Sequence, residues 1–456
     1  MTEREFAIDV VKRLRAAGHE ALWAGGCVRD QLLGLEPTDY DVATDAAPEQ
    51  VRRLFRHTVA VGASFGVIEV LGPRQPKGPP LSVEVATFRK DLVYSDGRRP
   101  DAVVFSSARE DALRRDFTIN GMFFDPLTDQ LIDYVGGQDD LRARLLRAIG
   151  DAPTRFSEDK LRMFRAVRFA TRFDLRIEPA TQQAILAMAP QIGVVSVERI
   201  AKELQGILIA RGRARGVALL DEVGLVKPIL PELLEMKDLP YGPPGAATGD
   251  LWQHTLIVLD LLGPGPSFPL AFAALLHDVG KRRALGRTPN RYTFHGHEHI
   301  GCRMASEIGH RLKLSNAERE RIEWLVDKHQ QLCDARRMRT SKLKKLLANP
   351  GIEELLALHR ADAEASGRST DHVTYCEQLL REWSEVDLNP PPLLTGHDLA
   401  RMGLEPGPLF KELLDAVREA QLDGTITGPK QAMELIERLL RERRGMANDE
   451  NPSKDQ

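Results

Sequence analysis

The chain has 456 residues, too many for one compact domain, and 28% of them are charged while only 6% are aromatic. It contains no run of about 18 apolar residues, so we expect no membrane span and a cytoplasmic protein. The net charge of −3 argues against a uniformly basic nucleic-acid binder, although arginine is dense from Arg142 to Arg176 and a second basic run begins at Ala335. The four cysteines lack metal-ligand spacing, so we expect free thiols.

The N-terminal third alternates between strand and helix patterns. Thr2 and Glu5 have the spacing of a capping box, which predicts an amphipathic helix rather than a signal peptide. Residues 21–26 predict a strand that enters a Gly-Gly turn, 28–35 a short helix, and 38–44 a strand with Asp39 and Asp41 on one face. Residues 48–57 predict a helix, and 65–72 with 81–88 a hairpin around a Pro/Gly-rich loop.

Helical periodicity dominates from about Asp139 to the C-terminus, which predicts an α+β protein. Two Pro/Gly-rich breaks, at 239–250 and 387–398, indicate boundaries between parts. We therefore expect a head with a small mixed sheet and helices, an all-helical neck and body, and further helical parts. The predicted divisions are 1–146, 147–240, 250–385, 390–445 and a disordered tail, 446–456.

Paired carboxylates near a glycine turn are typical of enzymes that handle phosphates. Asp39 and Asp41, two residues apart on a strand, can share divalent metal ions, and Glu84 on a nearby strand can be the third ligand. The Gly25–Gly26 turn lets backbone N–H groups approach a phosphate, and Arg29 adds a fork of donors. Each feature alone fits a solvated turn or strand edge equally well, but their order is more specific.

These motifs resemble those of the tRNA nucleotidyltransferases and bacterial poly(A) polymerases. The resemblance starts with GGCVRDQLLG from Gly25 and DYDVAT from Asp39, and continues through VEVATFRKDLVYSDGRRPDAVVF, RRDFTINGMFFDP and RFSEDKLRMFRAVRFATRF. It is dense from about Leu22 to Ile177 and weaker to about Glu235. It implies a nucleotidyltransferase head, with Mg²⁺ on Asp39 and Asp41, Glu84 as a further catalytic carboxylate, and pyrophosphate as the second product of a two-metal reaction.

A single helix is expected over FSEDKLRMFRAVRFA, with Asp159, Arg162, Arg165 and Arg168 in a row at steps of three. A basic solvent face is one interpretation. The other is base selection, because Asp159 can accept from the amino group of cytosine or adenine while Arg162 donates to the ring nitrogen. The resemblance assigns that role to this pair and places Arg115, Arg165 and Arg168 around the nucleotide. Asp116 is expected to orient Arg115 or to hold the ribose.

Histidines and aspartates in apolar helical contexts predict a second metal site after the first break. The segment from about Leu251 to Ala365 resembles the HD phosphohydrolase domain, which implies a divalent metal of unspecified identity on His254, His277, Asp278 and Asp362. Asp362 is the weakest match because Asp371 is nearby. His299 and His329 are candidates for further ligands.

The leading hypothesis is a template-independent enzyme that adds or repairs the 3′-terminal CCA of tRNA from CTP and ATP. The segment FRKDLVYSDGRRP resembles the mobile loop of full CCA-adding enzymes and favours this product over a poly(A) tail or CC-only or A-only addition. A hydrolase with an inert head would leave Asp39, Asp41 and Glu84 without a purpose. A pure RNA-binding module would leave the Asp-x-Asp motif unexplained.

Overall fold

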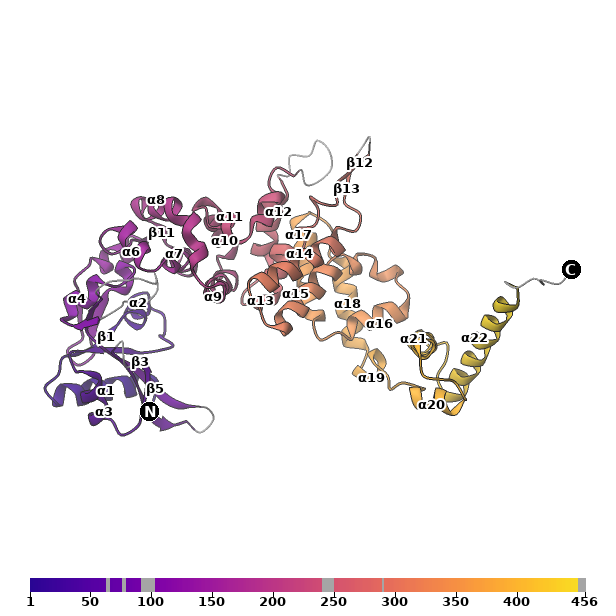
Figure 1. The fold of residues 1–456 in the computed structure, drawn as a ribbon, viewed down its shortest axis with the longest axis horizontal. Helices are drawn as coiled ribbons and strands as arrows, with labels where there is room; N and C mark the ends of the chain where they lie inside the picture. Colours follow the sequence, from indigo (N-terminus) through magenta and orange to yellow (C-terminus); the bar gives the residue numbers. More distant parts are fainter. Residues whose placement is uncertain (63–65, 76–78, 92–102, 240–249, 289–290, 450–456) are drawn as a thin grey trace. The chain divides into compact units, whose positions relative to one another are not determined.

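The computed structural model describes residues 1–62, 66–75, 79–91, 103–239, 250–288 and 291–449 (Figure 1). The chain forms two compact units. The first holds Met1–Leu239 with the short segments Gly263–Phe268 and Glu307–Ser315, and the second holds Pro240–Leu262, Pro269–Ser306 and Asn316–Gln456. The protein is α+β, with one large sheet near the N-terminus and helices after it, as the sequence predicts. The five-part division of the chain stays a prediction.

The large sheet of the first unit has seven strands in the order β3-β4-β5-β2-β1-β8-β9, and β2 and β5 are its parallel pair. The strands are β1 (Ala21–Ala24), β2 (Asp41–Thr44), β3 (Thr58–Gly62), β4 (Val67–Arg74), β5 (Pro80–Thr87), β8 (Met122–Asp125) and β9 (Gln130–Asp133). The expected hairpin is the antiparallel pair β4 and β5, and residues 76–78 of its loop lie outside the described part. A separate pair consists of β6 (Arg89–Asp91) and β7 (Val103–Phe105), and residues 92–102 of the expected mobile loop are likewise outside it.

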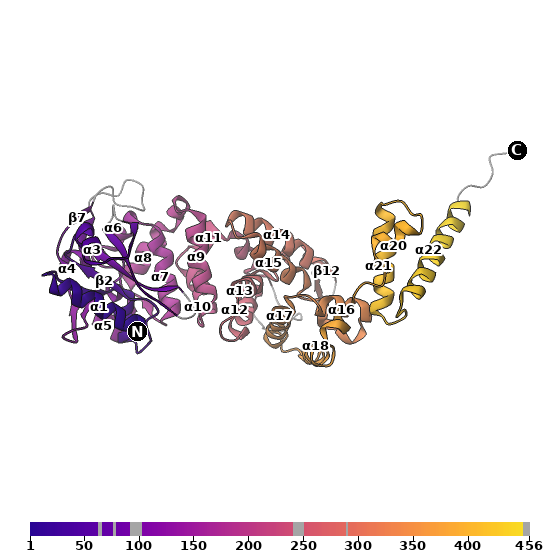
Figure 2. The same cartoon turned by 90° about the horizontal axis from the view of Figure 1, so that it is seen from below.

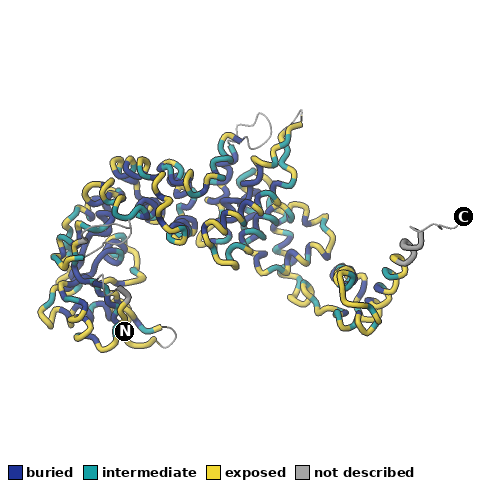
Figure 3. Tube along the Cα trace, viewed as in Figure 1, coloured by how far each residue is buried: buried dark blue, intermediate teal, exposed yellow. Residues whose placement is uncertain are grey.

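Helices flank this sheet, and its strands β1 and β8 are buried on both faces. The helices are α1 (Glu3–Ala16), α2 (Gly26–Leu32), α3 (Pro48–Leu54), α4 (Ala108–Leu113), η2 (Thr118–Asn120) and α5 (Gly137–Arg142). The capping box of α1 is formed by Thr2 and Glu5 as predicted. Leu22 and Phe123 pack with Ala112 of α4 in one core cluster, and Trp23, which points to the other face, lies beneath Arg4 of α1. The four-residue strand β1 is buried throughout (Figure 3).

The rest of the first unit is helical apart from the two-residue strands β10 (Leu145–Leu146) and β11 (Arg176–Ile177). Its helices are α6 (Ala152–Glu158), α7 (Leu161–Arg172), α8 (Pro179–Met188), η3 (Ala189–Val194), α9 (Val197–Leu208), α10 (Arg213–Glu222), α11 (Val226–Ile229) and η4 (Pro231–Met236). Helix α7 packs on α9 and α10, and Phe164 and Val167 are among its buried residues. The prediction of one helix through Asp159 is wrong, since α6 ends at Glu158 and Asp159 is extended, with φ −148°.

The second unit is a helical body whose two short strands are β12 (Gly286–Thr288) and β13 (Arg291–Thr293). Its helices begin with α12 (Leu251–Leu261), α13 (Phe268–Leu276), α14 (His297–Arg311), α15 (Asn316–Lys328) and η5 (Gln331–Arg337), and continue with α16 (Thr340–Leu347), α17 (Ile352–Ala365), α18 (Asp371–Glu382) and α19 (Glu385–Leu388). Phe268 of α13 and the end of α14 from Glu307 onward belong to the first unit. Helix α12 packs on α17, and α18 packs on η5. Among the described residues, no helix combines the length and the apolar character needed to cross a membrane.

The last helices form a small core of their own. They are α20 (Gly396–Arg401), α21 (Pro408–Leu422) and α22 (Pro429–Asp449) (Figure 2). These helices bury Leu399, Val417 and Ile436 in one cluster. Helix α22 extends to Asp449, past residue 446, where the sequence predicts the start of a disordered tail. Residues 450–456, like residues 240–249 of the first predicted break, lie outside the described part.

Candidate active site and metal centre

Carboxylates gather on one face of the sheet where β2 begins. Asp41 is the first residue of β2 and lies in register with Glu84 on the parallel strand β5. Directly paired residues point to the same face, so these two exposed side chains are neighbours. Asp39 is also exposed but precedes the strand, which starts at Asp41 rather than at residue 38. The register of β4 adds Glu69 opposite Glu84, a carboxylate that the sequence reasoning missed.

The chemistry of this set fits a hard divalent cation. Desolvation by the surrounding protein, followed by the charge of Glu84, raises the pKa of Asp41 to about 6, while Arg115 acts in the opposite direction. Clustered carboxylates repel one another unless a proton or a cation lies among them. Oxygen ligands of this kind are those that Mg²⁺ prefers.

Next to Asp41 the first unit has a cavity of about 530 Å³. All nine residues predicted to bind the nucleotide line it, namely Gly25, Gly26, Arg29, Arg115, Asp116, Asp159, Arg162, Arg165 and Arg168. The remaining lining residues are Asp41, Arg114, Asn120, Phe169, Arg172 and Arg199. The lining therefore contains eight arginines and three aspartates, and this excess of positive charge suits a polyanionic ligand. Asp39 and Glu84 are not among the lining residues.

Gly25 must be glycine for two reasons. Its φ is +73°, which side chains adopt rarely, and a Cβ there would lie 2.9 Å from Nη1 of Arg115. The backbone can thus turn sharply at the wall of the cavity, where α2 begins at Gly26. The predicted approach of its backbone to a phosphate stays a prediction.

Arg29 is more deeply engaged than its predicted role as a phosphate donor requires. Its side chain is buried, donates to Asp30 and to Oδ1 of Asn120 at 2.6 Å, and lies 4.2 Å from the ring centroid of Phe173. These contacts join α2, η2 and α7. The arrangement gives Arg29 the task of holding the cavity wall, and contact with a phosphate stays a prediction.

Asp116 accepts from Arg165 at 2.7 Å, and Asn120 also donates to it. Arg115, which the sequence paired with Asp116, donates instead to Asp111 at 2.9 Å. Burial alone would raise the pKa of Asp116, but the Arg165 charge and the Asn120 hydrogen bond outweigh burial and lower it to about 2. Asp116 is therefore a buried anion that fixes Arg165.

The two predicted base-selecting residues both face the cavity, but each already has a partner. Asp159 caps the first turn of α7 by accepting from the N–H of Leu161, and it accepts from Arg199 at 2.6 Å. Arg162 pairs with Glu158. Arg199 on α9 was missed because its sequence context reads only as an amphipathic helix. The break before α7 gives Asp159 a position separate from the arginine row.

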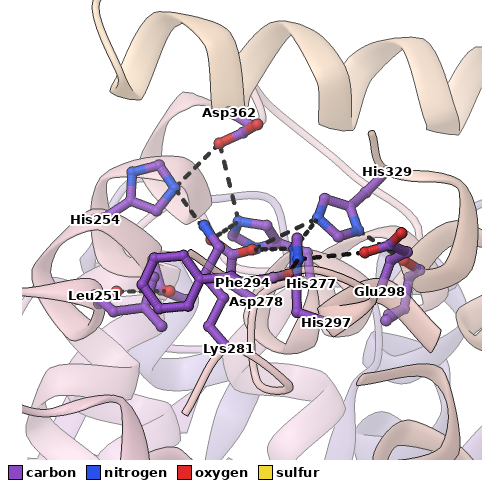
Figure 4. Close-up of polar contacts among 12 residues, drawn as sticks. Leu251, His254, His277, Asp278, Lys281, Phe294, His297, Glu298, His329 and Asp362 are labelled. Carbon is purple, nitrogen blue, oxygen red and sulfur yellow. Dashed lines mark hydrogen bonds and ion pairs between the residues drawn. The ribbon is translucent and has the colours of Figure 1, made fainter. Parts of the chain in front are cut away.

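A second constellation lies in the second unit, where six ligand-bearing side chains point toward a common centre (Figure 4). His254 comes from α12, His277 and Asp278 directly follow α13, His297 starts α14, His329 follows α15 and Asp362 belongs to α17. They form two adjacent sets of three ligand atoms, one with His254, His277 and Asp362 and one with Asp278, His297 and His329. Asp278 also lies 3.2 Å from Nε2 of His277 and joins the sets.

The orientation of the imidazoles fits a metal. His277, His297 and His329 each place Nδ1 within 2.6–2.8 Å of a backbone carbonyl three residues earlier, so Nδ1 carries the proton and Nε2 keeps a lone pair. The Nε2 atoms of His297 and His329 are 3.2 Å apart. Two lone pairs repel at that distance unless a cation lies near them. Nε2 of His277 and Oδ1 of Asp278 are buried with no hydrogen bond of their own in the described structure.

The structure brings together all four predicted ligands of this centre and separates the further candidates. His329 belongs to the cluster, whereas His299 is 68% exposed and pairs with Asp327. His297, rather than His299, belongs to the cluster, because it lies at the start of α14 on the side of the helix that faces the other ligands. Asp362, rather than Asp371, provides the late carboxylate. Burial of His297 was the missing signal, and alternating histidines in HGHEH do not reveal which of them is inside.

Comparison with known proteins matches three family models along the chain: the poly A polymerase head domain over residues 21–147, the "probable RNA and SrmB- binding site of polymerase A" over 174–237, and the HD domain over 251–367. An A-adding tRNA nucleotidyltransferase of Deinococcus radiodurans is 34% identical over 93% of this chain and 96% of its own length. The chain belongs to the tRNA nucleotidyltransferase family. A CCA-adding enzyme of a Geobacillus species, strain WCH70, is 30% identical over 95% of this chain and 97% of that enzyme.

Solved structures of the family agree with this fold. The crystal structure of the Bacillus stearothermophilus CCA-adding enzyme in complex with CTP has a TM-score of 0.70 and 28% identity, and the match covers 98% of this chain and all of that one. The Thermotoga maritima CCA-adding enzyme complexed with tRNA, at 20% identity and a TM-score of 0.57, supports the fold alone. The resemblance inferred from the motifs is thus confirmed, and the full-length relatives include both an A-adding and a CCA-adding enzyme.

Proposed function

We propose that this tRNA nucleotidyltransferase adds or repairs the complete 3′-terminal CCA of tRNA from CTP and ATP without a nucleic-acid template, in the cytoplasm. The observation that carries the proposal is the position of Asp41 and Asp159 on the lining of one cavity, with eight arginines around them. A nucleoside triphosphate has a base to be selected and phosphates to be neutralised, and this cavity offers a group for each task. A full-length CCA-adding relative supports the product.

The reaction joins the RNA 3′-hydroxyl to the α-phosphate of the bound nucleotide and releases pyrophosphate. Asp39, Asp41 and Glu84 are the residues proposed to hold Mg²⁺, which supplies charge neutralisation and a more acidic hydroxyl. Arginines that protein carboxylates already position, such as Arg165 on Asp116, face the phosphates. Such preorganised donors stabilise developing charge without rearranging during the reaction.

Base selection is assigned to Asp159 and Arg162. A carboxylate has several lone pairs, so Asp159 can keep its bond to Arg199 while it accepts from the amino group of cytosine or adenine. Arg162 donates to the adjacent ring nitrogen. Uracil and guanine present the opposite pattern at these atoms and leave both side chains unsatisfied. Arg199 fixes the orientation of Asp159, and Glu158 does the same for Arg162.

The test uses a tRNA transcript that ends before CCA, incubated with CTP alone, ATP alone, or both. We expect two cytidines with CTP alone, and two cytidines followed by one adenosine with both. A long A tail would identify a poly(A) polymerase. Release of phosphate without extension would identify a hydrolase with an inert head.

We also propose a second, metal-dependent activity of the HD centre, the hydrolysis of phosphate esters. The specific observation is the six converging ligands with their Nε2 lone pairs turned inward. The identity of the metal is part of the test: the protein is freed of metal and reloaded with Mn²⁺, Co²⁺, Ni²⁺ or Mg²⁺. Hydrolysis of p-nitrophenyl phosphate or a 2′,3′-cyclic nucleotide that depends on the metal supports the proposal, and inertness with all four would overturn it.

A further inference from the structure

A third group of potential metal ligands lies in the second unit and shares no residue with the HD centre. Cys333 comes from η5, His359 from α17 and His372 from α18. One ligand atom from each lies within 4.8 Å of those of the other two. We propose that Cys333, His359 and His372 form a zinc site separate from both centres described above.

The two imidazoles are arranged as ligands rather than as ordinary core residues. Nε2 of His359 lies 3.3 Å from the carbonyl oxygen of Lys328, and His372 hydrogen-bonds to the backbone of Ser369. A ring nitrogen that donates to a carbonyl leaves the other nitrogen with a lone pair, as in most metal-binding histidines. Nε2 of His372 is buried and has no hydrogen-bond partner among the described residues. Bound zinc would satisfy it.

Both rings are suited to binding as neutral imidazoles. The His359 side chain is fully buried, and its ring centroid lies 5.4 Å from that of His372. Two protonated rings at that separation would repel each other inside the protein. Burial, and then the neighbouring His372, lower the pKa of His359 to about 3, so that ring is neutral at physiological pH. Neutral imidazole is the form that binds metal.

The third ligand selects the metal. A thiolate with two imidazoles is a set that suits zinc, whereas Mg²⁺ and Ca²⁺ prefer oxygen. Cys333 is exposed and lies on the wall of a cavity of about 380 Å³. Desolvation by the surrounding protein raises the pKa of the Cys333 thiol while the charge of Arg368 acts in the opposite direction, so a bound metal ion would itself displace the thiol proton.

The cavity also leaves room for a further ligand on the metal. His372 and Cys333 both line it, so a zinc ion there keeps a coordination position toward open space. Three protein ligands with an open fourth position are typical of zinc that binds water or an anion. The ion would also join η5, α17 and α18 at one point, in addition to the Arg360–Glu377 ion pair between α17 and α18 and the contact of Arg336 with the ring of Tyr375.

The direct test titrates the metal-free full-length protein with Co²⁺, which replaces zinc and reports its ligands by absorption. A thiolate ligand gives a near-ultraviolet sulfur-to-cobalt band, which the nitrogen and oxygen ligands of the HD centre cannot give. We expect this band to rise to saturation, to vanish in Cys333→Ser, and to weaken at least about tenfold in His372→Ala. It should persist in Asp278→Asn and in Cys302→Ser, the matched cysteine control. Absence of the band in the wild type, or its survival in Cys333→Ser, would overturn the proposal.

A second measurement needs no variant. Iodoacetamide labelling of the wild type, followed by peptide mapping, should show that Zn²⁺ slows modification of Cys333 at least about tenfold. Cys302, which is half-buried, should be modified at the same rate with and without Zn²⁺. Equal labelling of Cys333 in both conditions would contradict a zinc site. Both tests are independent of nucleotide incorporation, so their failure leaves the proposed transferase function intact.

Discussion

The head cavity and the HD centre both contain carboxylates that can bind a cation, but they differ in the burial of those carboxylates and in which side chains are held in place. In the head, Asp41 and Glu84 are exposed at the start of a strand pair, and the surrounding arginines are already bonded to carboxylates of the protein. In the HD centre, all six ligand-bearing residues are buried, and their backbone hydrogen bonds fix the rings. The geometry therefore suits a charged substrate in the head and a bound metal ion in the HD centre.

Because the two centres share no residue, we expect that a variant which inactivates one centre leaves the activity of the other unchanged. In the head, the arginines of the cavity wall are held in place, whereas the carboxylates stay exposed, and in the proposed function they would receive a cation together with the triphosphate. The HD centre places its preorganisation in the ligands, where like groups face one another at hydrogen-bond distance. Variants that remove one centre should therefore leave the other working.

The largest expected effect is in the head. Asp41→Ala should lower nucleotide incorporation about 1,000-fold or more. Without Asp41 the site would lose the metal ion that neutralises the charge on the reacting phosphate. Incorporation of labelled CTP into a tRNA lacking CCA measures it, while metal-dependent phosphoester hydrolysis should be unchanged. Glu69→Gln is the matched control, since Glu69 lies in the same row of the sheet, and it should lose less than about tenfold. A larger loss in Glu69→Gln than in Glu84→Gln would show that the third carboxylate is Glu69.

A variant that loses hydrolysis but keeps nucleotide incorporation tests the HD centre. Asp278→Asn should abolish metal-dependent hydrolysis and reduce bound metal, because Asp278 contacts both ligand sets. Nucleotide incorporation should stay within about twofold of the wild type. His299→Ala, an exposed histidine two residues from His297, is the control and should keep both activities. Equal metal content in Asp278→Asn and the wild type would contradict the assignment.

A smaller effect is expected on base selection. Asp159→Asn replaces half of an acceptor with a donor, so the preference for CTP over UTP should fall by about 10- to 100-fold. Arg199→Ala should change the same ratio less, because it loosens Asp159 without removing it. Separate kcat and KM values for CTP and UTP measure the ratio. Arg142→Ala, an exposed arginine outside the cavity, should leave it unchanged, and an unaltered ratio in Asp159→Asn would argue against base reading by this side chain.

The smallest effect concerns stability of the cavity wall. The pKa of Asp116 is about 2 in the folded protein against an ordinary value of 3.8, so its ionised form contributes about 2 kcal/mol of stability. A depressed pKa means that this contribution is present above about pH 4 and is lost as pH falls toward 2. Asp116→Asn should lower the free energy of unfolding by about that amount at neutral pH, measured by urea denaturation.

The control for that measurement is an exposed ion pair. Asp174 pairs with Arg144 at the surface, and both side chains are largely exposed, so Asp174→Asn should cost less than about 1 kcal/mol. Asparagine also tolerates the positive φ of residue 174. The gap between Asp116→Asn and the wild type should narrow as pH falls through 4. A gap that is constant with pH would mean that the Arg165 pair is not its source.

Much of the head could be predicted because its features are local in sequence. The glycine turn, the hairpin with Glu84 and the short-range spacing of the arginines follow from strand and helix periods. The break between α6 and α7 at Asp159 could not be predicted, because the pattern of apolar residues continues across the break. The carboxylate of Asp159 accepts from the first N–H of α7 and so favours the end of one helix and the start of the next. Asp39 was placed on the strand because alternation alone cannot show where pairing starts.

Contacts between distant elements set the other limit. Glu69 enters the carboxylate row through sheet register, and Arg199 reaches Asp159 from a helix whose sequence reads as ordinary packing. His297 and His299 share one motif, and only the direction of α14 decides which is buried. Cys333, His359 and His372 lie on three elements far apart in the sequence, so the spacing of the cysteines gave no sign of a site.

The most direct test of the central claim compares three tRNA transcripts that end before CCA, after C and after CC. Each is incubated with CTP and ATP, and its 3′ end is sequenced at single-nucleotide resolution. Our account predicts that all three end in CCA and stop there, because one cavity selects cytosine and adenine through the same amino and ring-nitrogen pattern. Extension of the CC-ending transcript alone would contradict it and identify an enzyme that adds only the final adenosine.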